Sequence, residues 1–191
     1  VGSEMCIRDR LTTLDISQNT RLSRLICSNN KLTALSLQQN TKLEYLDFQN
    51  NNLTAIDLSQ NAWLQYLHCN NNHLTVLDVS KNLSLEYLYC SSNNLTKLDV
   101  QQNTALQELN VSHNNLSELD VRQNTALKTL RCSNNHLAKL DIQQNTELTS
   151  LNCSENMYFI DTVNGTFDLS TLPDGFDRNK TSDWTCLLYT S

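Results

Sequence analysis

The chain has 191 residues, of which 39% are hydrophobic and only 18% charged, and its net charge is −6. This acidity argues against nucleic acid or an anionic membrane as the main partner, because both select patches of lysine and arginine. No apolar run approaches the roughly 20 residues that span a bilayer. With only three glycines and one proline, we expect asparagine, which tolerates left-handed backbone, to build the turns.

Both ends of the chain depart from the pattern that lies between them. Residues 1–10 and 186–191 resemble translated sequencing-adapter sequence, and we expect both segments to be non-native tails. On this interpretation the native protein extends beyond both ends, and a signal peptide or an anchor would lie outside this sequence.

Residues 11–156 repeat one phrase in alternating steps of 10 and 11 residues. The phrase is L-x-x-L-x-φ-x-x-N, where φ is apolar, and one example is Leu22, Leu25, Cys27 and Asn30. Two phrases make a unit of 21 residues, and about seven units follow one another without an insertion. A period this short indicates a solenoid of stacked coils.

The same phrase predicts which side chains are buried. Side chains alternate along a strand, so the second Leu and the apolar residue two positions later point inward. One coil buries about six apolar side chains at roughly 1.5–3 kcal/mol each, whereas ordering its residues costs about 30 kcal/mol. The coils must therefore stack. We predict an all-β-dominated solenoid with parallel strands and little or no α-helix, with the closing asparagines inside the corners, bonded to backbone of their own and the next coil.

The phrase L-x-x-L-x-L-x-x-N-x-L resembles the leucine-rich-repeat signature. Its nested form, L-x-x-L-x-C-S-x-N-x-L-T-x-L-D-V-S-x-N-T-x, is similar to the short 21-residue class of bacterial surface proteins, which includes internalin-like proteins with a cysteine ladder. The resemblance covers residues 11–156 and implies a right-handed leucine-rich-repeat coil. It is specific for the fold and does not specify a function.

Five of the seven cysteines occupy one inward position of the repeat: Cys27, Cys69, Cys90, Cys132 and Cys153. No C-x-x-C pair or tetrahedral ligand set accompanies them, so we expect buried free thiols that act as small hydrophobic side chains. Neighbouring thiols such as Cys69 and Cys90 come close enough for a disulfide, but their parallel directions oppose one.

The outward columns of the first-half strands vary between coils, as a surface that meets a partner can. Tyrosine and tryptophan contribute much of the binding energy where they cluster. We predict that the contact residues are Tyr45, Asp47, Trp63, Tyr66, His68, Tyr87, Tyr89, Glu108 and Arg131. The alternative is a cross-coil aromatic ladder that only stabilises the sheet.

The second halves carry an outward column of aspartates: Asp15, Asp57, Asp78, Asp99, Asp120 and Asp141. We expect the amides that follow them to donate hydrogen bonds to these carboxylates, and the column lacks the oxygen cage that calcium requires. The four histidines complete no catalytic set, because the thiols point inward. We therefore predict no catalytic residue, no metal, no cofactor and no enzymatic activity.

After Asn156 the register fails, and residues 157–185 are expected to form a degenerate last coil and the C-terminal exit. The varied, tyrosine-rich face favours a protein-binding module for adhesion or recognition, and the resemblance to internalin-like proteins implies that it belongs to a secreted or cell-surface bacterial protein. A glycan is the alternative ligand, and we expect a monomer. The alternative function is a targeting domain of a larger secreted enzyme whose catalytic part is missing from this fragment; the full-length gene would separate the two.

Overall fold

The computed structural model describes residues 4–6 and 10–156, and within them eight short strands form one parallel sheet in chain order. The strands are β1 (Glu4–Cys6), β2 (Arg24–Ile26), β3 (Tyr45–Asp47), β4 (Tyr66–His68), β5 (Tyr87–Tyr89), β6 (Glu108–Asn110), β7 (Thr129–Arg131) and β8 (Ser150–Asn152). No helix occurs in the described ranges. The predicted solenoid of parallel strands is confirmed.

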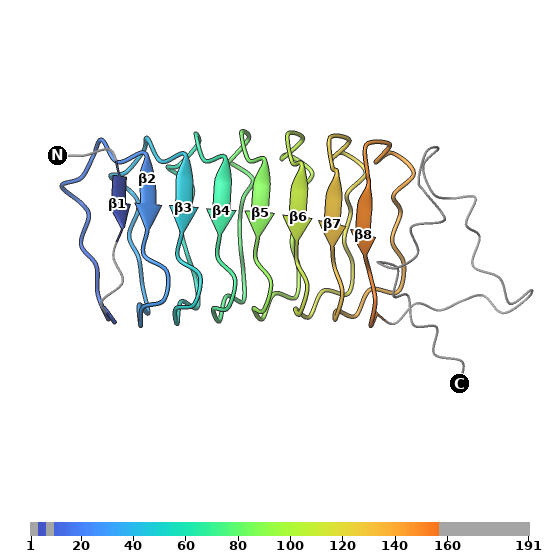
Figure 1. Cartoon of the computed structure of the whole chain (residues 1–191), viewed down its shortest axis with the longest axis horizontal. Coiled ribbons are helices and arrows are strands. Elements are labelled where there is room, and N and C mark those ends of the chain that lie inside the picture. The colour runs from blue at the N-terminus through green and yellow to red at the C-terminus, as the bar shows by residue number, and fades with distance from the viewer. Residues whose placement is uncertain (1–3, 7–9, 157–191) are drawn as a thin grey trace, which may run out of the picture.

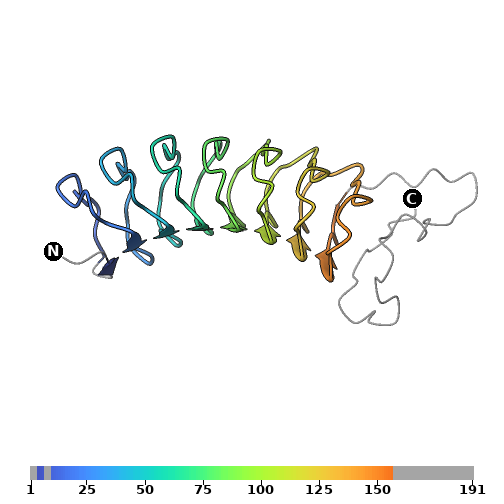
Figure 2. The same ribbon diagram turned by 90° about the horizontal axis from the view of Figure 1, so that it is seen from above.

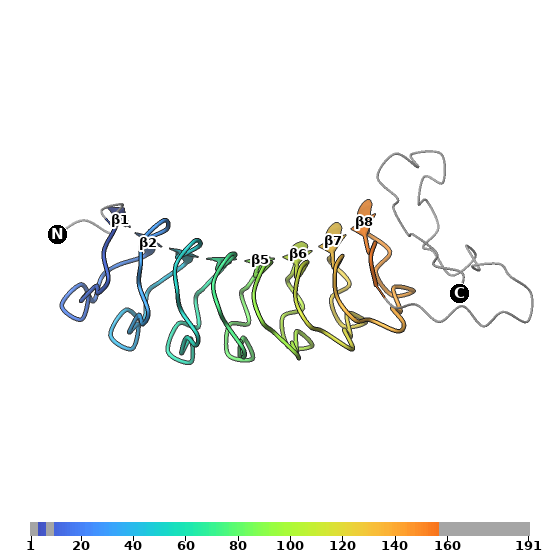
Figure 3. The same cartoon turned by 90° about the horizontal axis from the view of Figure 1, so that it is seen from below.

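The coils stack side by side with all their strands on one face (Figure 1). Seen from above and from below, the stack is curved, and the strands lie on its concave side while the opposite loops spread apart (Figures 2 and 3). The sheet hydrogen bonds hold neighbouring strands at a spacing of about 4.8 Å. The second halves of the coils fan outward on the convex side (Figures 2 and 3).

Strand register keeps the same residue type in line from coil to coil. Leu25 pairs with Leu46, and Leu46 pairs with Leu67, each 21 residues further along the chain. These three leucines are fully buried, as is Cys27, whereas the residues that flank the central leucine of each strand point away from the core. The predicted alternation of inward and outward side chains is confirmed.

One row of asparagines fills the corner that follows each strand, from Asn30 to Asn156. In Asn51, Nδ2 donates to the carbonyl oxygens of Phe48 (2.9 Å) and Cys27 (3.0 Å), while Oδ1 accepts the amide of Leu32 (3.0 Å). Both ends of the side-chain amide are thus satisfied. Cys27 and Leu32 belong to the preceding coil, so the prediction of bonds to the next coil was wrong in direction.

A second row, the inner asparagine row, fills the opposite corner and comprises Asn40, Asn61, Asn82, Asn103, Asn124 and Asn145. Each side chain is fully buried. In Asn103, Nδ2 donates to the carbonyl oxygens of Val79 and Asn82 in the preceding coil, both at 2.9 Å. The Oδ1 atoms of all six have no hydrogen-bond partner among the described residues. This row therefore joins coils through its donors alone.

Strand β1 lies inside the segment that the sequence predicts to be a non-native tail. It places Met5 opposite Leu25, a separation of 20 residues instead of the 21 that separates Leu25 from Leu46. The sheet thus has one strand more than the seven repeats require. The predicted last coil at 157–185 and the predicted tail at 186–191 lie outside the described residues.

Candidate functional site

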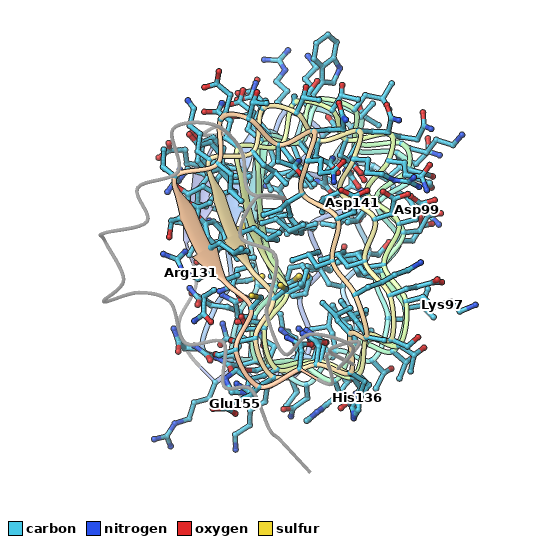
Figure 4. The ribbon with its side chains drawn as sticks, turned by 90° about the vertical axis from the view of Figure 1, so that its right-hand side faces the viewer. Lys97, Asp99, Arg131, His136, Asp141 and Glu155 are labelled. Atoms are coloured by element: carbon cyan, nitrogen blue, oxygen red, sulfur yellow. The ribbon has the colours of Figure 1, made fainter. Side chains whose placement is uncertain are left out.

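The outward side chains of the strands form the concave face, and those of the second halves form the convex face. Viewed along the stack, Arg131 projects from the strand side, whereas Lys97, Asp99 and Asp141 project from the opposite side (Figure 4). The two faces are built from the same coils but have different chemistry. The concave face carries the columns that vary from coil to coil.

Five ring side chains on β3, β4 and β5 form a continuous aromatic ladder on the concave face: Tyr45, Tyr66, His68, Tyr87 and Tyr89. The rings of Tyr66 and Tyr87 are stacked, with centroids 4.4 Å apart and an angle of 4° between their planes. Tyr45 lies 5.6 Å from Tyr66 and 5.5 Å from His68. His68 meets Tyr89 edge-on at 4.5 Å. Strand pairing brings these rings together, because each lies one coil from the next.

Charged side chains close both ends of the aromatic ladder. The guanidinium of Arg24 on β2 lies 3.6 Å from the centroid of the Tyr45 ring, a cation–π contact. At the other end, the Tyr89 hydroxyl donates a 2.6 Å hydrogen bond to Oε2 of Glu108 on β6. The sequence prediction included Glu108 but missed Arg24, although Arg24 stands in the same column as Tyr45 and Tyr66.

Burial within the aromatic ladder shifts the ionisation of its members. Burial lowers the pKa of His68 from its ordinary value of 6.5; the nearby Asp47 carboxylate opposes this shift and Arg24 reinforces it. Burial, followed by the hydrogen bond to Glu108, raises the pKa of Tyr89 well above 10.0. Both shifts favour the neutral forms of His68 and Tyr89, and the charged groups Arg24 and Glu108 stand at the two ends of the ladder.

Asp47 is the one predicted contact residue that the structure removes from the accessible surface. Its side chain is only 6% exposed, and its carboxylate accepts hydrogen bonds from the backbone amide and the side chain of Gln49. The column position is outward, as predicted, but the neighbouring side chains cover it. Asp47 lies beside His68 in the strand register and, although we predicted it as a contact residue, it offers a partner almost no surface.

The other predicted contact residues are at least partly exposed. Arg131 on β7 is exposed, and Glu108 is half-buried against Tyr89. Trp63 is 66% exposed, but it lies on the corner before β4 and makes no ring contact with the aromatic ladder. The structure thus separates Trp63 from the other predicted residues.

The aspartates of the convex-face column accept hydrogen bonds within local turns. Asp57 accepts the amide of Ser59 at 2.9 Å, Asp78 accepts that of Ser80 at 2.9 Å, and the other column members bond in the same way. These hydrogen bonds lower the pKa of Asp57 and Asp78. The predicted donors are confirmed. In the described part of the chain, no three His, Cys, Asp or Glu side chains are grouped to hold a metal.

The five cysteines of the repeat are buried and none of them forms a disulfide, as predicted. Burial, with a smaller contribution from Asp47, raises the pKa of Cys27 to about 12. A thiol that stays protonated in an apolar core is a poor nucleophile.

None of the described residues forms a helix of the length and apolarity that crossing a membrane requires.

Leucine-rich-repeat family models match residues 39–59, 70–82 and 105–123. The structure is similar to the functional domain of InlJ from Listeria monocytogenes, which includes a cysteine ladder, with 47% identity and a TM-score of 0.81 over 84% of this chain. It is also similar to the internalin InlF from the same organism, with 27% identity and a TM-score of 0.72 over 76% of this chain. No curated protein sequence matches.

A more distant similarity connects the chain to the ectodomain of the plant membrane receptor kinase GASSHO1/SCHENGEN3 from Arabidopsis thaliana. There the identity is 27% and the TM-score 0.65 over 72% of this chain. The chain spans 36% of the InlJ structure, 45% of the InlF structure and 19% of the receptor ectodomain.

Leucine-rich repeats therefore build this solenoid. Among leucine-rich-repeat proteins, it resembles the internalin-like proteins, and it shares with InlJ a ladder of cysteines in the core.

Proposed function

We propose that the chain is the recognition module of a secreted or cell-surface bacterial protein, and that it binds another protein through the aromatic ladder. The similarity to InlJ and InlF of Listeria monocytogenes supports the bacterial and surface setting. The receptor kinase ectodomain, whose structure is a complex with CASPARIAN STRIP INTEGRITY FACTOR 2, supports binding as a use of this architecture. We propose no catalytic role for the solenoid.

The observation that carries this proposal is the aromatic ladder itself. Its rings are half-buried because they cover one another, as the stacked faces of Tyr66 and Tyr87 do, and part of each ring's surface stays exposed on the concave face. Rings that are fixed by their neighbours lose little further entropy when a partner covers them. Their exposed surface is apolar, while the hydroxyl groups and the charged ends at Arg24 and Glu108 supply direction. A rigid aromatic surface of this kind suits a protein partner, and the glycan alternative would use the same surface.

The experiment uses the full chain as bait against a displayed library of extracellular protein domains and, in parallel, a glycan array. Each ligand found is then titrated against the triple variant Tyr45→Ala, Tyr66→Ala and Tyr87→Ala. We expect affinity to fall at least about tenfold, because aromatic side chains dominate interface energy. The matched control changes three convex-face residues, Lys97, Glu118 and Lys139, to alanine and leaves affinity unchanged.

The same variants separate binding from stabilisation of the sheet. If the tyrosines serve only the sheet, the triple variant unfolds at lower denaturant concentration but binds its ligand with undiminished affinity. That result would remove the aromatic ladder as the recognition surface. A ligand found only on the glycan array would change the partner class and keep the surface.

The alternative role as a targeting domain of a secreted enzyme uses the same concave surface. The full-length gene distinguishes the two roles. A catalytic domain in the full-length gene would favour the targeting role, whereas a wall anchor would favour the adhesion role.

A further inference from the structure

Two exposed hydrophobic side chains lie on one edge of the solenoid, outside the aromatic ladder. This edge consists of the corners that lead into the strands, and we call it the leading edge. Trp63 is 66% exposed on the corner before β4, and Leu83 is 58% exposed on the corner before β5. The other large exposed hydrophobic residue in the described ranges, Val76, stands in the convex-face column of Lys97. An apolar pair on neighbouring coils is a candidate contact surface.

A shallow hollow of about 550 Å³, open to solvent, lies further along the same leading edge. Small side chains line it, namely Ala105, Thr125, Ala126 and Thr146, together with Gln107, Lys128 and Glu147. Ala126 occupies the repeat position of Trp63, three units of 21 residues later. At about 4.8 Å per coil, the centre of the hollow lies about 14 Å from Trp63 along the stack. One edge thus carries a large apolar projection and, beside it, a recess made of small residues.

When six residues along this edge are set against the same six in reverse order, opposite charges and complementary side-chain sizes face each other. The column that contains the tryptophan reads Arg21, Lys42, Trp63, Ser84, Ala105, Ala126, Glu147, and the pairing uses the six residues from Lys42 to Glu147 and leaves Arg21 beyond its end. Read against itself in the opposite direction, it places Lys42 opposite Glu147, Trp63 opposite Ala126 and Ser84 opposite Ala105. A cation meets an anion, and the largest side chain meets one of the smallest.

The neighbouring columns of the leading edge are compatible with the same pairing. Reversal places Leu83 opposite Thr104 and Glu86 opposite Gln107, and it brings no like charges together in either column. Lys42 and Glu147 are both exposed, and neither forms an ion pair within the described residues. The two charged groups that would meet are therefore available.

We propose that the leading edge is a two-fold interface between two copies of this chain, which run antiparallel with Trp63 of each copy seated in the hollow of the other. In a two-fold contact one patch meets itself, so every pairing occurs twice. The axis passes between β5 and β6 and is perpendicular to the sheet. Because the stack bends along the direction of that axis (Figure 2), the two curved edges stay in register. Both concave faces then open on the same side and remain free.

This interface replaces the monomer that we expected from the sequence. The paired edge is about 29 Å long, for six coils at about 4.8 Å each. One edge offers less than the roughly 800 Å² per partner of a standard stable complex. We therefore expect a reversible dimer with a dissociation constant in the micromolar range.

Sedimentation velocity of the full chain, from low micromolar to several hundred micromolar concentration, tests the proposal. The wild type should shift from monomer to dimer over this range. Trp63→Ala and Lys42→Glu should each raise the dissociation constant about tenfold or more. The charge exchange Lys42→Glu with Glu147→Lys should restore association to within about threefold of the wild type, because it re-forms both ion pairs in reverse.

Two control variants change matched positions off the edge. Val76→Ala removes an equally exposed hydrophobic side chain from the convex face, and Lys31→Glu reverses a charge on the opposite corner; neither should alter association. All substitutions are on the surface, and thermal melts verify the fold of each. A wild type that stays monomeric at the highest concentration overturns the proposal. So does a charge exchange that fails to restore the dimer, or a Trp63→Ala effect no larger than that of Val76→Ala.

Discussion

The inner asparagine row and the aromatic ladder both repeat a contact from one coil to the next, yet they differ in burial and in constancy. The asparagines at the inner corner are fully buried and occur in every coil from Asn40 to Asn145. The aromatic ladder is half-exposed and spans only β3 to β5, after which the same column continues as Glu108, Thr129 and Ser150. The coil thus holds some positions constant and lets others change.

The physical reason for this difference is whether water can replace the side chain. A buried carbonyl that loses its asparagine donor keeps only its backbone donor, and water does not replace the lost hydrogen bond between coils. A ring on the concave face that is lost exposes its neighbour to water at modest cost. Constancy therefore marks the positions that hold the coils together, and variation marks the positions that are free for recognition.

The largest effect that would test this comparison is a loss of stability in the variant Asn103→Ala, which changes one member of the inner asparagine row. It removes the 2.9 Å hydrogen bonds that Asn103 donates to the carbonyl oxygens of Val79 and Asn82, each of which keeps a backbone amide donor. At roughly 0.5–1.5 kcal/mol for each hydrogen bond lost, we expect a loss of about 1–3 kcal/mol. Denaturant unfolding followed by circular dichroism measures it.

The matched control for Asn103→Ala is Gln102→Ala, which alters the exposed neighbour one residue earlier and should leave stability nearly unchanged. A loss below about 1 kcal/mol for Asn103→Ala would mean that water reaches the inner corner. The distinction between constant and free positions would then fail at its strongest point.

A smaller effect is expected at the end of the aromatic ladder, in the variant Tyr89→Phe. It removes the 2.6 Å hydrogen bond to Glu108, and at this partly exposed site we expect a loss of about 0.5–1 kcal/mol near neutral pH. Because the folded state raises the pKa of Tyr89 above 10.0, it holds the phenol proton more tightly than the unfolded chain. The stabilisation is thus complete below pH 10 and is lost as the pH rises above it.

Denaturant unfolding of the wild type and Tyr89→Phe between neutral and alkaline pH measures this difference. The gap between the two proteins should shrink above pH 10, where the unfolded tyrosine ionises. Tyr45→Phe is the control, since the Tyr45 hydroxyl makes no hydrogen bond with the described residues. A gap that widens with rising pH would contradict the assigned bond.

The smallest expected effect is a gain in stability from a substitution in the turn that follows a strand. Ser92 adopts φ of 54°, in line with Asn29, Asn50 and Asn71, whose side chains form a chain of hydrogen bonds. Asparagine tolerates this left-handed backbone better than serine does. Ser92→Asn should stabilise the protein by about 0.5 kcal/mol, which corresponds to a rise of about 1–2 °C in Tm.

Thr104→Asn is the comparison for this gain, because it introduces the same side chain where φ is not positive. It should leave Tm unchanged or lower it. Equal gains from both substitutions would show that backbone conformation does not explain the asparagines of this turn.

Much of the fold could be predicted from the spacing of a few residue types. The 21-residue period placed the buried leucines such as Leu25, the inward Cys27 and the corner asparagines correctly, because a stack of identical coils repeats every environment. The donors to the aspartate column followed from local turn geometry. The direction of the asparagine bonds did not, since the phrase is the same whether a side chain reaches backward or forward.

The columns that form the candidate site could be predicted from the sequence, whereas the burial and the contacts of individual residues in them could not. Both columns of the aromatic ladder were found from the sequence, but the burial of Asp47 and the contact of Arg24 with the Tyr45 ring were not. These depend on how side chains of neighbouring coils lean across one another. The hollow beside Trp63 was also invisible, because it is a property of several small residues together.

The sequence by itself determined the repeat, the side of the strand that each residue occupies and the core that results, because periodic burial leaves one arrangement of the chain. Only the tertiary structure decided that the strands lie on the concave side, which rings touch, and which edge of the stack carries both a projection and a recess. These features arise from the relative packing of coils in three dimensions, and no single phrase of the sequence encodes that packing.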